Sequence, residues 1–377
     1  MKYRRVGRTD LEFSVISFGA MRVGSCTEAE TIAMVHRALD RGVNFFETGP
    51  LYQDSMSRLG QAFGGRPEEI HVCSKAICRP SEEWKPGWMM TADDARRNID
   101  WSLETLGVDQ LDLFGGWSMS DESMWQAFLA KGGPLAGIHK AMDEKLVKHV
   151  YGTSHDVPEN TVKWLKTGEF AAITIPYNIA KRHFRVVIDY CAENQIGCFT
   201  MQPTAGGFLA TTGGRLGQLI AEHVGEQDPA QAAQRWLLAH AGITAVPVGF
   251  TSLEQVESSC EIADEADALM ARGEDAVDYL ADYADLAAGL CTRCGYCEPC
   301  PEGLPLRNAI QPYQMWKILG DDEALRKYLS HLKVDPALCQ ECGQCTEKCP
   351  QSLPIPQFMG EIVEEMKRLG ISVPAAQ

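Results

Sequence analysis

Eight short apolar segments recur between Val15 and Gly249 and alternate with segments of helical periodicity. Each is short enough to be a strand and is bounded by Gly, Pro, Asn or a charged residue. The expected strands are Val15–Met21, Val43–Glu47, Ile70–Lys75, Leu111–Trp117, Val147–Thr153, Ala171–Tyr177, Ile196–Gln202 and Ile243–Gly249. Strands that alternate with helices form a parallel sheet, and at this length we expect a closed (β/α)8 TIM barrel. A doubly wound open sheet is the alternative, but its glycine-rich phosphate motif is missing after the first strand.

Three of the intervening helices carry start signals. A Ser or Thr followed three residues later by Glu, Asp or Gln can satisfy the first backbone N–H groups of a helix. The pairs are Thr27 with Glu30, Thr91 with Asp94, and Ser252 with Gln255. Gly107 is placed to end the helix that follows Thr91, because glycine readily adopts the left-handed conformation of a helix end.

Eight of the 14 cysteines lie in two short runs near the C-terminus. The first run is Cys291, Cys294, Cys297 and Cys300, followed by Pro301, and the second is Cys339, Cys342, Cys345 and Cys349, followed by Pro350. Three thiolates two residues apart can wrap three corners of an iron–sulfur cubane from one tight loop, and the fourth corner takes a cysteine from elsewhere. The spacing predicts two [4Fe–4S] clusters in a small α-helical ferredoxin-like domain.

The two runs are expected to interlock. In two-cluster ferredoxins the last cysteine of each run binds the other cluster, which assigns Cys349 to the first run's cluster and Cys300 to the second's. Cys300 departs from the pattern, because two residues precede it where ferredoxins have three. Structural zinc is the alternative, but zinc ribbons use separated Cys-x2-Cys pairs and explain runs of four poorly.

Charge and hydropathy exclude some partners. The formal net charge of −16 argues against nucleic acid and against an anionic membrane surface, since both attract basic patches. No apolar run is long enough to span a bilayer, and none follows Met1–Asp10 as a signal peptide would require. We therefore expect a cytoplasmic protein, in which reduced cysteines are available as metal ligands.

These features divide the chain into three parts. We expect the barrel over residues 1–270, an acidic helical linker over 271–290 and the ferredoxin-like domain over 291–377. Between Glu261 and Asp285 acidic residues surround a single basic residue, Arg272. A solvated helical face is the favoured interpretation, and a docking surface for a basic redox partner protein is the alternative.

Polar or distinctive side chains stand at the predicted C-terminal ends of the strands, where barrels of this kind place their chemistry. In strand order they are Glu47 and Tyr52, Lys75, Trp117, Ser154 and His155, Tyr177 and Asn178, Gln202, and finally Gly249, Thr251 and Gln255. A single Lys or Tyr is usually a solvated or capping side chain. Their shared position at one face of the barrel predicts an active site.

The same segments resemble the aldo-keto reductases, specifically the branch that carries a ferredoxin-like tail. Tyr3–Thr9 with Val15–Met21 resembles that family's first hairpin and strand, Val43–Tyr52 its Asp-Thr-Ala-x-x-Tyr motif, Gly152–His155 and Pro176–Asn178 its nicotinamide site, and Val246–Ser252 its phosphate-gripping region. The resemblance covers the whole chain.

The resemblance implies an oxidoreductase that transfers a hydride between a nicotinamide nucleotide, NAD(P)(H), and a small carbonyl, alcohol or enone substrate. Tyr52 would be the proton donor, and Lys75 would lower the pKa of its phenol. The nucleotide would be bound by Ser154, His155, Tyr177, Asn178, Gln202, Gly249, Thr251 and Gln255. The clusters would carry electrons.

Two positions of the catalytic tetrad depart from the family. Glu47 replaces an aspartate and adds a methylene group, and Trp117 replaces a histidine. An indole donates one hydrogen bond but neither accepts one nor exchanges a proton. The departures favour a re-purposed site, for C=C reduction, for an aromatic substrate that stacks on Trp117, or for chemistry fed with electrons by the clusters. The alternative is a degenerate barrel that serves as a redox-sensing or electron-transfer module.

The choice between NAD and NADP depends on the region after the eighth strand. Residues Gly249 to Ser258 contain no Lys or Arg that could pair with a 2′-phosphate, and Glu254 and Glu257 would repel one. Backbone amides near Ser252 could still hold phosphate. Charge in this segment therefore does not favour NADP.

Overall fold

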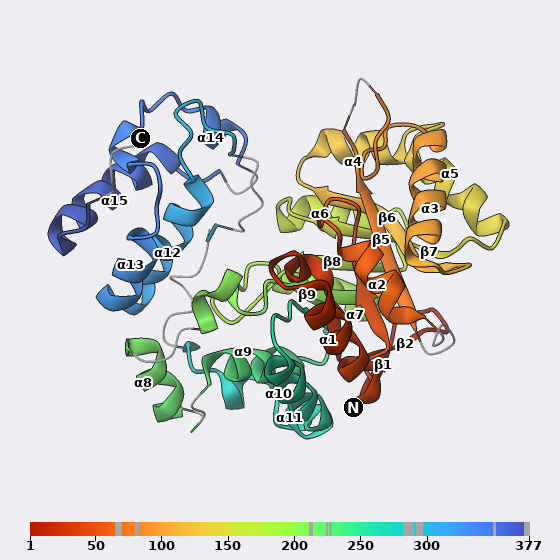
Figure 1. Ribbon diagram of the computed structural model, residues 1–377, viewed down its shortest axis with the longest axis horizontal. Helices are drawn as coiled ribbons and strands as arrows, with labels where there is room; N and C mark the ends of the chain where they lie inside the picture. Colours follow the sequence, from red (N-terminus) through yellow and green to blue (C-terminus); the bar gives the residue numbers. More distant parts are fainter. Residues whose placement is uncertain are drawn as a thin grey trace. The chain divides into compact units, whose positions relative to one another are not determined.

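The computed structural model describes residues 1–64, 70–79, 83–210, 214–223, 225, 228–281, 290–291, 297–349 and 352–372. The chain forms two compact units (Figure 1). The barrel unit comprises Met1–Tyr177, Phe184–Pro203 and Gln234–Ala276, and the second unit comprises Asn178–His183, Thr204–Ala233 and Val277–Gln377.

All eight predicted strands are present and form one parallel sheet. In spatial order they are β10 (Val246–Val248), β3 (Ile16–Gly19), β4 (Phe45–Glu47), β5 (His71–Ile77), β6 (Leu111–Met119), β7 (Val147–Ser154), β8 (Ala172–Pro176) and β9 (Gly197–Met201). Hydrogen bonds from Thr244 N to Cys198 O (2.7 Å) and from Thr200 N to Ala245 O (3.3 Å) join the two edges. The predicted barrel is therefore confirmed as a nearly closed one.

Two strands begin two or three residues later than expected. The N–H of Asn44 donates to Ser14 Oγ and its Oδ1 accepts from Ser14 N, so β4 starts only at Phe45. Thr244 and Ala245 are used in the closure against β9, so β10 starts at Val246. In both places hydrogen bonds outside the regular ladder displace the strand start.

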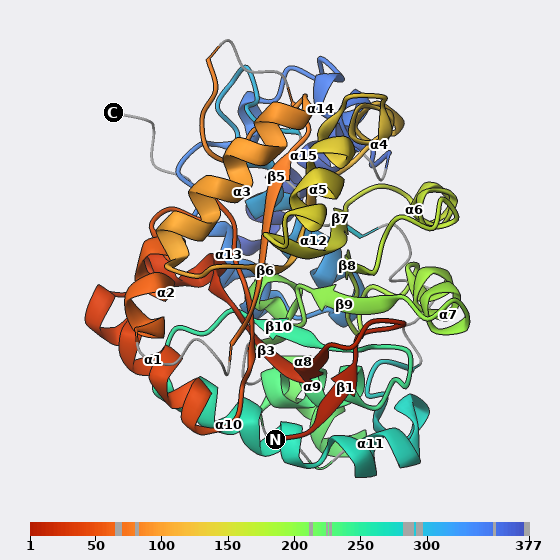
Figure 2. The ribbon, with the colours of Figure 1, turned by 90° about the vertical axis from the view of Figure 1, so that its right-hand side faces the viewer.

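Helices cover the outside of this sheet, as Figure 2 shows for α1, α2, α3, α5 and α7. The helical elements of the barrel unit are η1 (Ala20–Ser25), α1 (Glu28–Asp40), α2 (Ser55–Phe63), α3 (Ala92–Leu106), α4 (Glu122–Leu129), α5 (Pro134–Asp143), α6 (Pro158–Leu165), α7 (Arg185–Glu193), α10 (Leu253–Asp264) and α11 (Ala266–Arg272). The predicted starts are confirmed: Thr27 and Thr91 form reciprocal capping boxes with Glu30 and Asp94, and Ser252 Oγ accepts from Gln255 N. Gly107 ends α3 in the left-handed conformation.

A hairpin of β1 (Tyr3–Arg5) and β2 (Glu12–Ser14) precedes the barrel and fills its N-terminal end. Phe13 is fully buried and stacks on Phe45, with ring centroids 4.0 Å apart. Val6 and Leu11 belong to the same buried cluster, which includes residues from β5, β6, β7, β8 and β9. Apolar side chains thus fill the N-terminal end of the barrel, and barrels of this kind place their chemistry at the other end.

The second unit is built mainly of helices. Its helical elements are η3 (Ala205–Ala210), α8 (Gly214–His223), α12 (Leu306–Leu319), α13 (Asp322–Leu329), η6 (Pro336–Leu338), α14 (Gln344–Glu347) and α15 (Ile355–Leu369). Two further elements, α9 (Pro229–Leu238) and η4 (Glu274–Val277), have residues assigned to both units. Helices α12, α13 and α15 share one apolar cluster, which includes Ile310, Leu325 and Met359. Within the described residues, no helix is long and apolar enough to cross a membrane.

Candidate active site and iron–sulfur ligands

A buried ion pair joins the ends of two neighbouring strands. Glu47 is the last residue of β4, Lys75 lies within β5, and both side chains are almost fully buried. The ammonium of Lys75 donates to Glu47 Oε1 and to the backbone carbonyl of Thr48, the latter at 3.0 Å. Burial lowers the pKa of Lys75 well below its usual value, and the carboxylate opposes that effect by favouring the charged form.

Two aromatic rings flank the same ammonium. Lys75 Nζ lies 4.7 Å from the ring centroid of Tyr52 and 5.4 Å from that of Trp117. The two rings meet edge to face, with centroids 4.9 Å apart and planes at 80°. Gly49 packs closely against this group, since a Cβ there would lie 3.3 Å from Lys75 Cγ and 3.4 Å from Trp117 Cζ3. The structure thus brings the four predicted catalytic side chains into one cluster.

The ionisation of Tyr52 differs from the sequence expectation. Burial raises the pKa of Tyr52 above its usual value. Within the described residues no hydrogen bond joins Lys75 to the Tyr52 hydroxyl, because the ammonium faces the ring instead. In this arrangement Lys75 therefore does not lower the pKa, and the phenol stays protonated at neutral pH.

A β-bulge sets the direction of Trp117. The register between β6 and β7 shifts between Gly116 and Met119, and Ser118 adopts a left-handed φ of 53°. The Ser118 N–H donates to Thr153 Oγ1 at 2.6 Å, which fixes the bulge to β7. Bulges beside active sites commonly re-aim a side chain. Thr153 belongs to the Gly152–His155 motif noted in the sequence, but its role in fixing this bulge was not predicted, because the bulge depends on a contact between two strands.

Ser154 and His155 follow at the end of β7. The Ser154 hydroxyl bonds to Thr161 Oγ1 at 2.6 Å and accepts from Asp156 N at 3.2 Å, so it organises the start of α6. His155 is buried, and its backbone N–H donates to the backbone carbonyl of Met119 at 2.7 Å.

The next two strand ends contribute buried or conformationally unusual residues. Tyr177 is buried and stacks on Trp236, with centroids 5.3 Å apart. Gln202 follows β9 with a left-handed φ of 61°. Asn178 belongs to the second unit, where its Oδ1 accepts from Ala180 N at 3.1 Å. Tyr177 and Gln202 thus lie at the predicted strand ends of the barrel unit.

The segment after β10 forms a capped helix start. Gln255 Oε1 accepts from Thr251 N at 2.9 Å, and Ser252 Oγ accepts from Gln255 N at 3.3 Å. Gly249 is the first residue after β10. The side chain of Arg22 packs against it, since a Cβ on Gly249 would lie 2.7 Å from Arg22 Cγ. A helix start of this kind directs backbone N–H groups and a positive dipole end outward, which suits a nucleotide's phosphates.

The cysteines of both runs border one apolar cluster of the second unit. Cys297 is part of that cluster, and Cys291, Cys300, Cys339, Cys345 and Cys349 pack against it. Cys342 is exposed, and Cys294 lies outside the described residues. Among the described residues no three potential ligands already converge on one point. The donor set, all thiolates, and the shared cluster both fit iron–sulfur binding.

Family models match most of the chain. Residues 15–269 match the aldo/keto reductase family, and residues 287–353 match the 4Fe–4S dicluster domain. Both matches agree with the resemblance drawn from the sequence motifs and confirm it.

Individual relatives align with the barrel and not with the whole chain. L-galactose dehydrogenase of Arabidopsis thaliana is 22% identical over 290 residues, which cover 71% of this chain and 90% of that protein. 6-Dehydroglucose reductase of Novosphingobium aromaticivorans is 26% identical over 293 residues, covering 72% and 91%. The holo form of aldo-keto reductase AKR11C1 from Bacillus halodurans superposes with a TM-score of 0.63 at 22% identity, over 74% of this chain and 96% of that one, which shows the shared fold.

Proposed function

The chain belongs to the aldo/keto reductase family, and we propose that its barrel transfers a hydride between a nicotinamide nucleotide and a small carbonyl, alcohol or enone. With the 4Fe–4S dicluster domain, it is an oxidoreductase equipped for iron–sulfur electron transfer. The comparisons favour this function over a degenerate barrel. The observation that carries the proposal is the cluster of Tyr52, Lys75, Glu47 and Trp117 at the C-terminal ends of β4, β5 and β6.

Tyr52 is the proton donor in this proposal. Its phenol is protonated at neutral pH and stands beside the Lys75 ammonium, which stabilises negative charge as it develops on the substrate oxygen. Glu47 holds that ammonium in place through the buried ion pair. The nucleotide supplies the hydride, and the residues of the chain orient the substrate and deliver the proton.

Trp117 makes the tetrad atypical. Its indole N–H can donate to a substrate oxygen, but it cannot shuttle a proton as a histidine would. The ring offers a flat apolar wall beside Tyr52, 4.9 Å between centroids. We infer a substrate with a flat or apolar face next to its reducible bond, and an enone or an aromatic carbonyl meets that description.

For the nucleotide we propose the strand-end residues Ser154, His155, Tyr177, Asn178, Gln202, Gly249, Thr251 and Gln255. Gly249 and the capped start of α10 fit the phosphates, and Tyr177 follows β8 at the same end of the barrel. Ser154 and Gln255 would act through the backbone they cap, because their side chains are engaged in capping.

For the second unit we propose two [4Fe–4S] clusters. Cys291, Cys294, Cys297 and Cys349 would hold one, and Cys339, Cys342, Cys345 and Cys300 the other. The packing of both runs against one apolar cluster supports this interlocked assignment. Clusters of this kind supply one-electron transfer.

We further propose the organisation expected from the sequence, with the barrel over 1–270, the linker over 271–290 and the ferredoxin-like domain over 291–377. A reducing cytoplasm would keep the cysteines available as ligands. The acidic residues of the linker suit a basic redox partner protein.

Two measurements on anaerobically purified protein test this function. Calorimetric titration should show binding of NADH or NADPH, and the absence of both would overturn the hydride proposal. Iron and sulfide assays should give about eight of each per chain, as two [4Fe–4S] clusters require. A value near four would refute the second cluster, and zinc in place of iron would refute both.

A further inference from the structure

Tyr52 lies in a tight turn between β4 and α2. Its backbone N–H donates to Gly49 O at 3.0 Å, and its carbonyl accepts from Ser55 N at 3.1 Å. The hydroxyls of Thr48 and Ser55 are 2.9 Å apart and close the turn. The ring of Tyr52 meets a cation and another ring, and such contacts are less directional than a hydrogen bond to its hydroxyl would be. The position of that hydroxyl therefore depends on where the turn is held.

A largely buried arginine holds the far end of this turn. Arg58 lies in α2, and its side chain is 13% exposed. Its Nε donates to Asp54 Oδ2 at 2.8 Å, and its Nη2 lies 2.6 Å from the same oxygen. Asp54 occupies the N-cap position of α2, and it comes directly after Tyr52 and Gln53 in the sequence. Arg58 is thus joined to the end of the turn that carries Tyr52.

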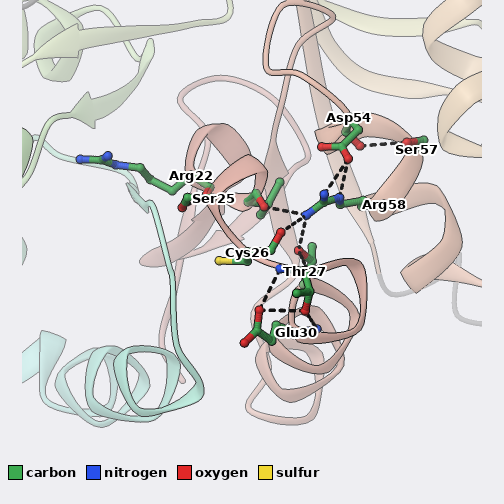
Figure 3. A network of polar contacts seen from close by, with 10 residues as sticks. Arg22, Ser25, Cys26, Thr27, Glu30, Asp54, Ser57 and Arg58 are labelled. Carbon is green, nitrogen blue, oxygen red and sulfur yellow. Dashed lines mark hydrogen bonds and ion pairs between the residues drawn. The ribbon is translucent and has the colours of Figure 1, made fainter.

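The same guanidinium also reaches the segment that follows β3. Arg58 Nη1 donates to the carbonyl of Val23 in η1 at 2.8 Å, and to the carbonyl of Cys26, directly after η1, at 2.6 Å. Figure 3 shows Arg58 between the two segments, with Asp54 on one side and Cys26 on the other. A planar fork of donors lets one side chain bond a carboxylate and two carbonyls together. Arg58 therefore links η1 to the Tyr52 turn.

A second contact joins the same two segments. Gln53, the residue after Tyr52, has a left-handed φ of 54°. A Cβ on Gly24 of η1 would lie 1.8 Å from Gln53 Oε1, so the Gln53 side chain lies directly against the backbone of Gly24. The turn that carries Tyr52 thus rests on η1 at two points, and Arg58 supplies the charged one.

We propose that Arg58 is a positioning residue for Tyr52, because it fixes the turn against η1 and so sets the point from which the phenol delivers its proton. This inference rests on the proposed role of Tyr52 as the proton donor. Proton transfer requires the donor to lie within hydrogen-bond reach of the substrate oxygen, and a displacement of about 1 Å can cost about 10²-fold in rate. Arg58 acts through the backbone of the turn and needs no contact with the substrate.

Single-turnover rates of hydride transfer test this role, with NADH or NADPH and a carbonyl or enone that the wild type reduces. Arg58→Ala should slow transfer about 10²-fold and leave the nucleotide dissociation constant unchanged. Arg58→Lys should fall between, because lysine keeps the charge without the planar fork. Arg96→Ala is the matched control and should keep the wild-type rate, since Arg96 of α3 also pairs with a carboxylate one helical turn away, at Asp100 (2.8 Å).

Hydrogen exchange gives a readout that does not depend on activity. The peptide that spans Gly49 to Ser55 should exchange faster in Arg58→Ala than in the wild type, and it should not change in Arg96→Ala. Unchanged exchange in this peptide would show that Arg58 does not hold the turn and would overturn the inference.

A double variant separates positioning from a general loss of stability. If Arg58 acts through Tyr52, adding Arg58→Ala to Tyr52→Phe should cost little further rate, because the misplaced group is already absent. Arg58→Lys serves in the same cycle if Arg58→Ala does not fold. Losses that multiply in the double variant, or a wild-type rate in both Arg58 variants, would overturn the inference and leave the function standing. An unchanged rate in Tyr52→Phe alone would overturn the proton-donor assignment and this inference with it.

Discussion

The ammonium of Lys75 lies 4.7 Å from the ring centroid of Tyr52, over the face of the ring and not against the hydroxyl. The proposed acid and its cation are therefore coupled through the π system, while Glu47 and the Thr48 carbonyl take the ammonium's hydrogen bonds. Removing the Tyr52 hydroxyl should leave this packing intact, which makes chemistry and structure separable at this residue.

Tyr52→Phe should lower the turnover number about 10²- to 10⁴-fold for any substrate that the wild type reduces, since a positioned proton donor contributes about that much. The ring and its contacts with Lys75 and Trp117 remain, so nucleotide affinity and melting temperature should not change. Tyr190→Phe, on the outer helix α7, is the control and should be fully active. Unchanged turnover in Tyr52→Phe would show that Tyr52 is not the proton donor.

Glu47→Gln should destabilise the barrel by about 3–5 kcal/mol at pH 7, because it leaves the buried Lys75 charge without its partner. Burial lowers the pKa of Lys75, so the folded variant holds fewer protons than the unfolded chain below the ordinary lysine pKa of about 10.4. Its stability should therefore rise with pH toward that value. Urea unfolding at pH 7 and pH 9.5 measures the change.

A second variant separates the loss of the pair from the loss of the carboxylate's packing. Glu47→Gln combined with Lys75→Met removes both charges and should recover most of the stability at pH 7. A double variant no more stable than Glu47→Gln would contradict the ion-pair account.

The sequence predicted the barrel well because its signals are local. Alternating apolar segments and the capping pairs at Thr27 and Thr91 depend only on nearby residues, and both appear as expected. The face of the barrel that bears Glu47, Lys75 and Trp117 was also predictable, since parallel strands end at one edge.

What sequence reasoning missed depends on contacts between distant segments. Arg22 and Gly249 are far apart in the chain, and only the pairing of β3 with β10 brings them together. Thr153 accepts a hydrogen bond from Ser118 in the bulge next to Trp117, and the sequence pattern of the strand does not predict that bulge. Lys75 was expected to lower the pKa of Tyr52. The structure does not show this effect, because Glu47 and the Thr48 carbonyl direct the ammonium away from the hydroxyl.

His240 should make the barrel unit sensitive to acid. Burial, together with the nearby Arg185 and Arg4, lowers the pKa of His240 to about 4. The unfolded chain takes up its proton near pH 6.5, so stability should be lost as the pH falls from about 6.5 to 4, by up to about 3 kcal/mol. His240→Gln should flatten this part of the urea-midpoint profile. His139→Gln, at an exposed position, should keep the wild-type slope, and a steep profile in His240→Gln would assign the loss to other groups.

Trp117→His tests whether the indole restricts the chemistry. The change introduces a ring that can donate a hydrogen bond to a carbonyl oxygen and exchange a proton, at a position beside both Tyr52 and Lys75. We expect kcat/KM for a small aliphatic aldehyde to rise about 10- to 100-fold, while that for a substrate with a flat apolar face falls. Trp117→Phe keeps an aromatic wall without any hydrogen bond, and it should not gain aldehyde activity. A gain in both variants would mean that Trp117 merely blocks space, and a gain in neither would mean that Glu47 or another group limits carbonyl reduction.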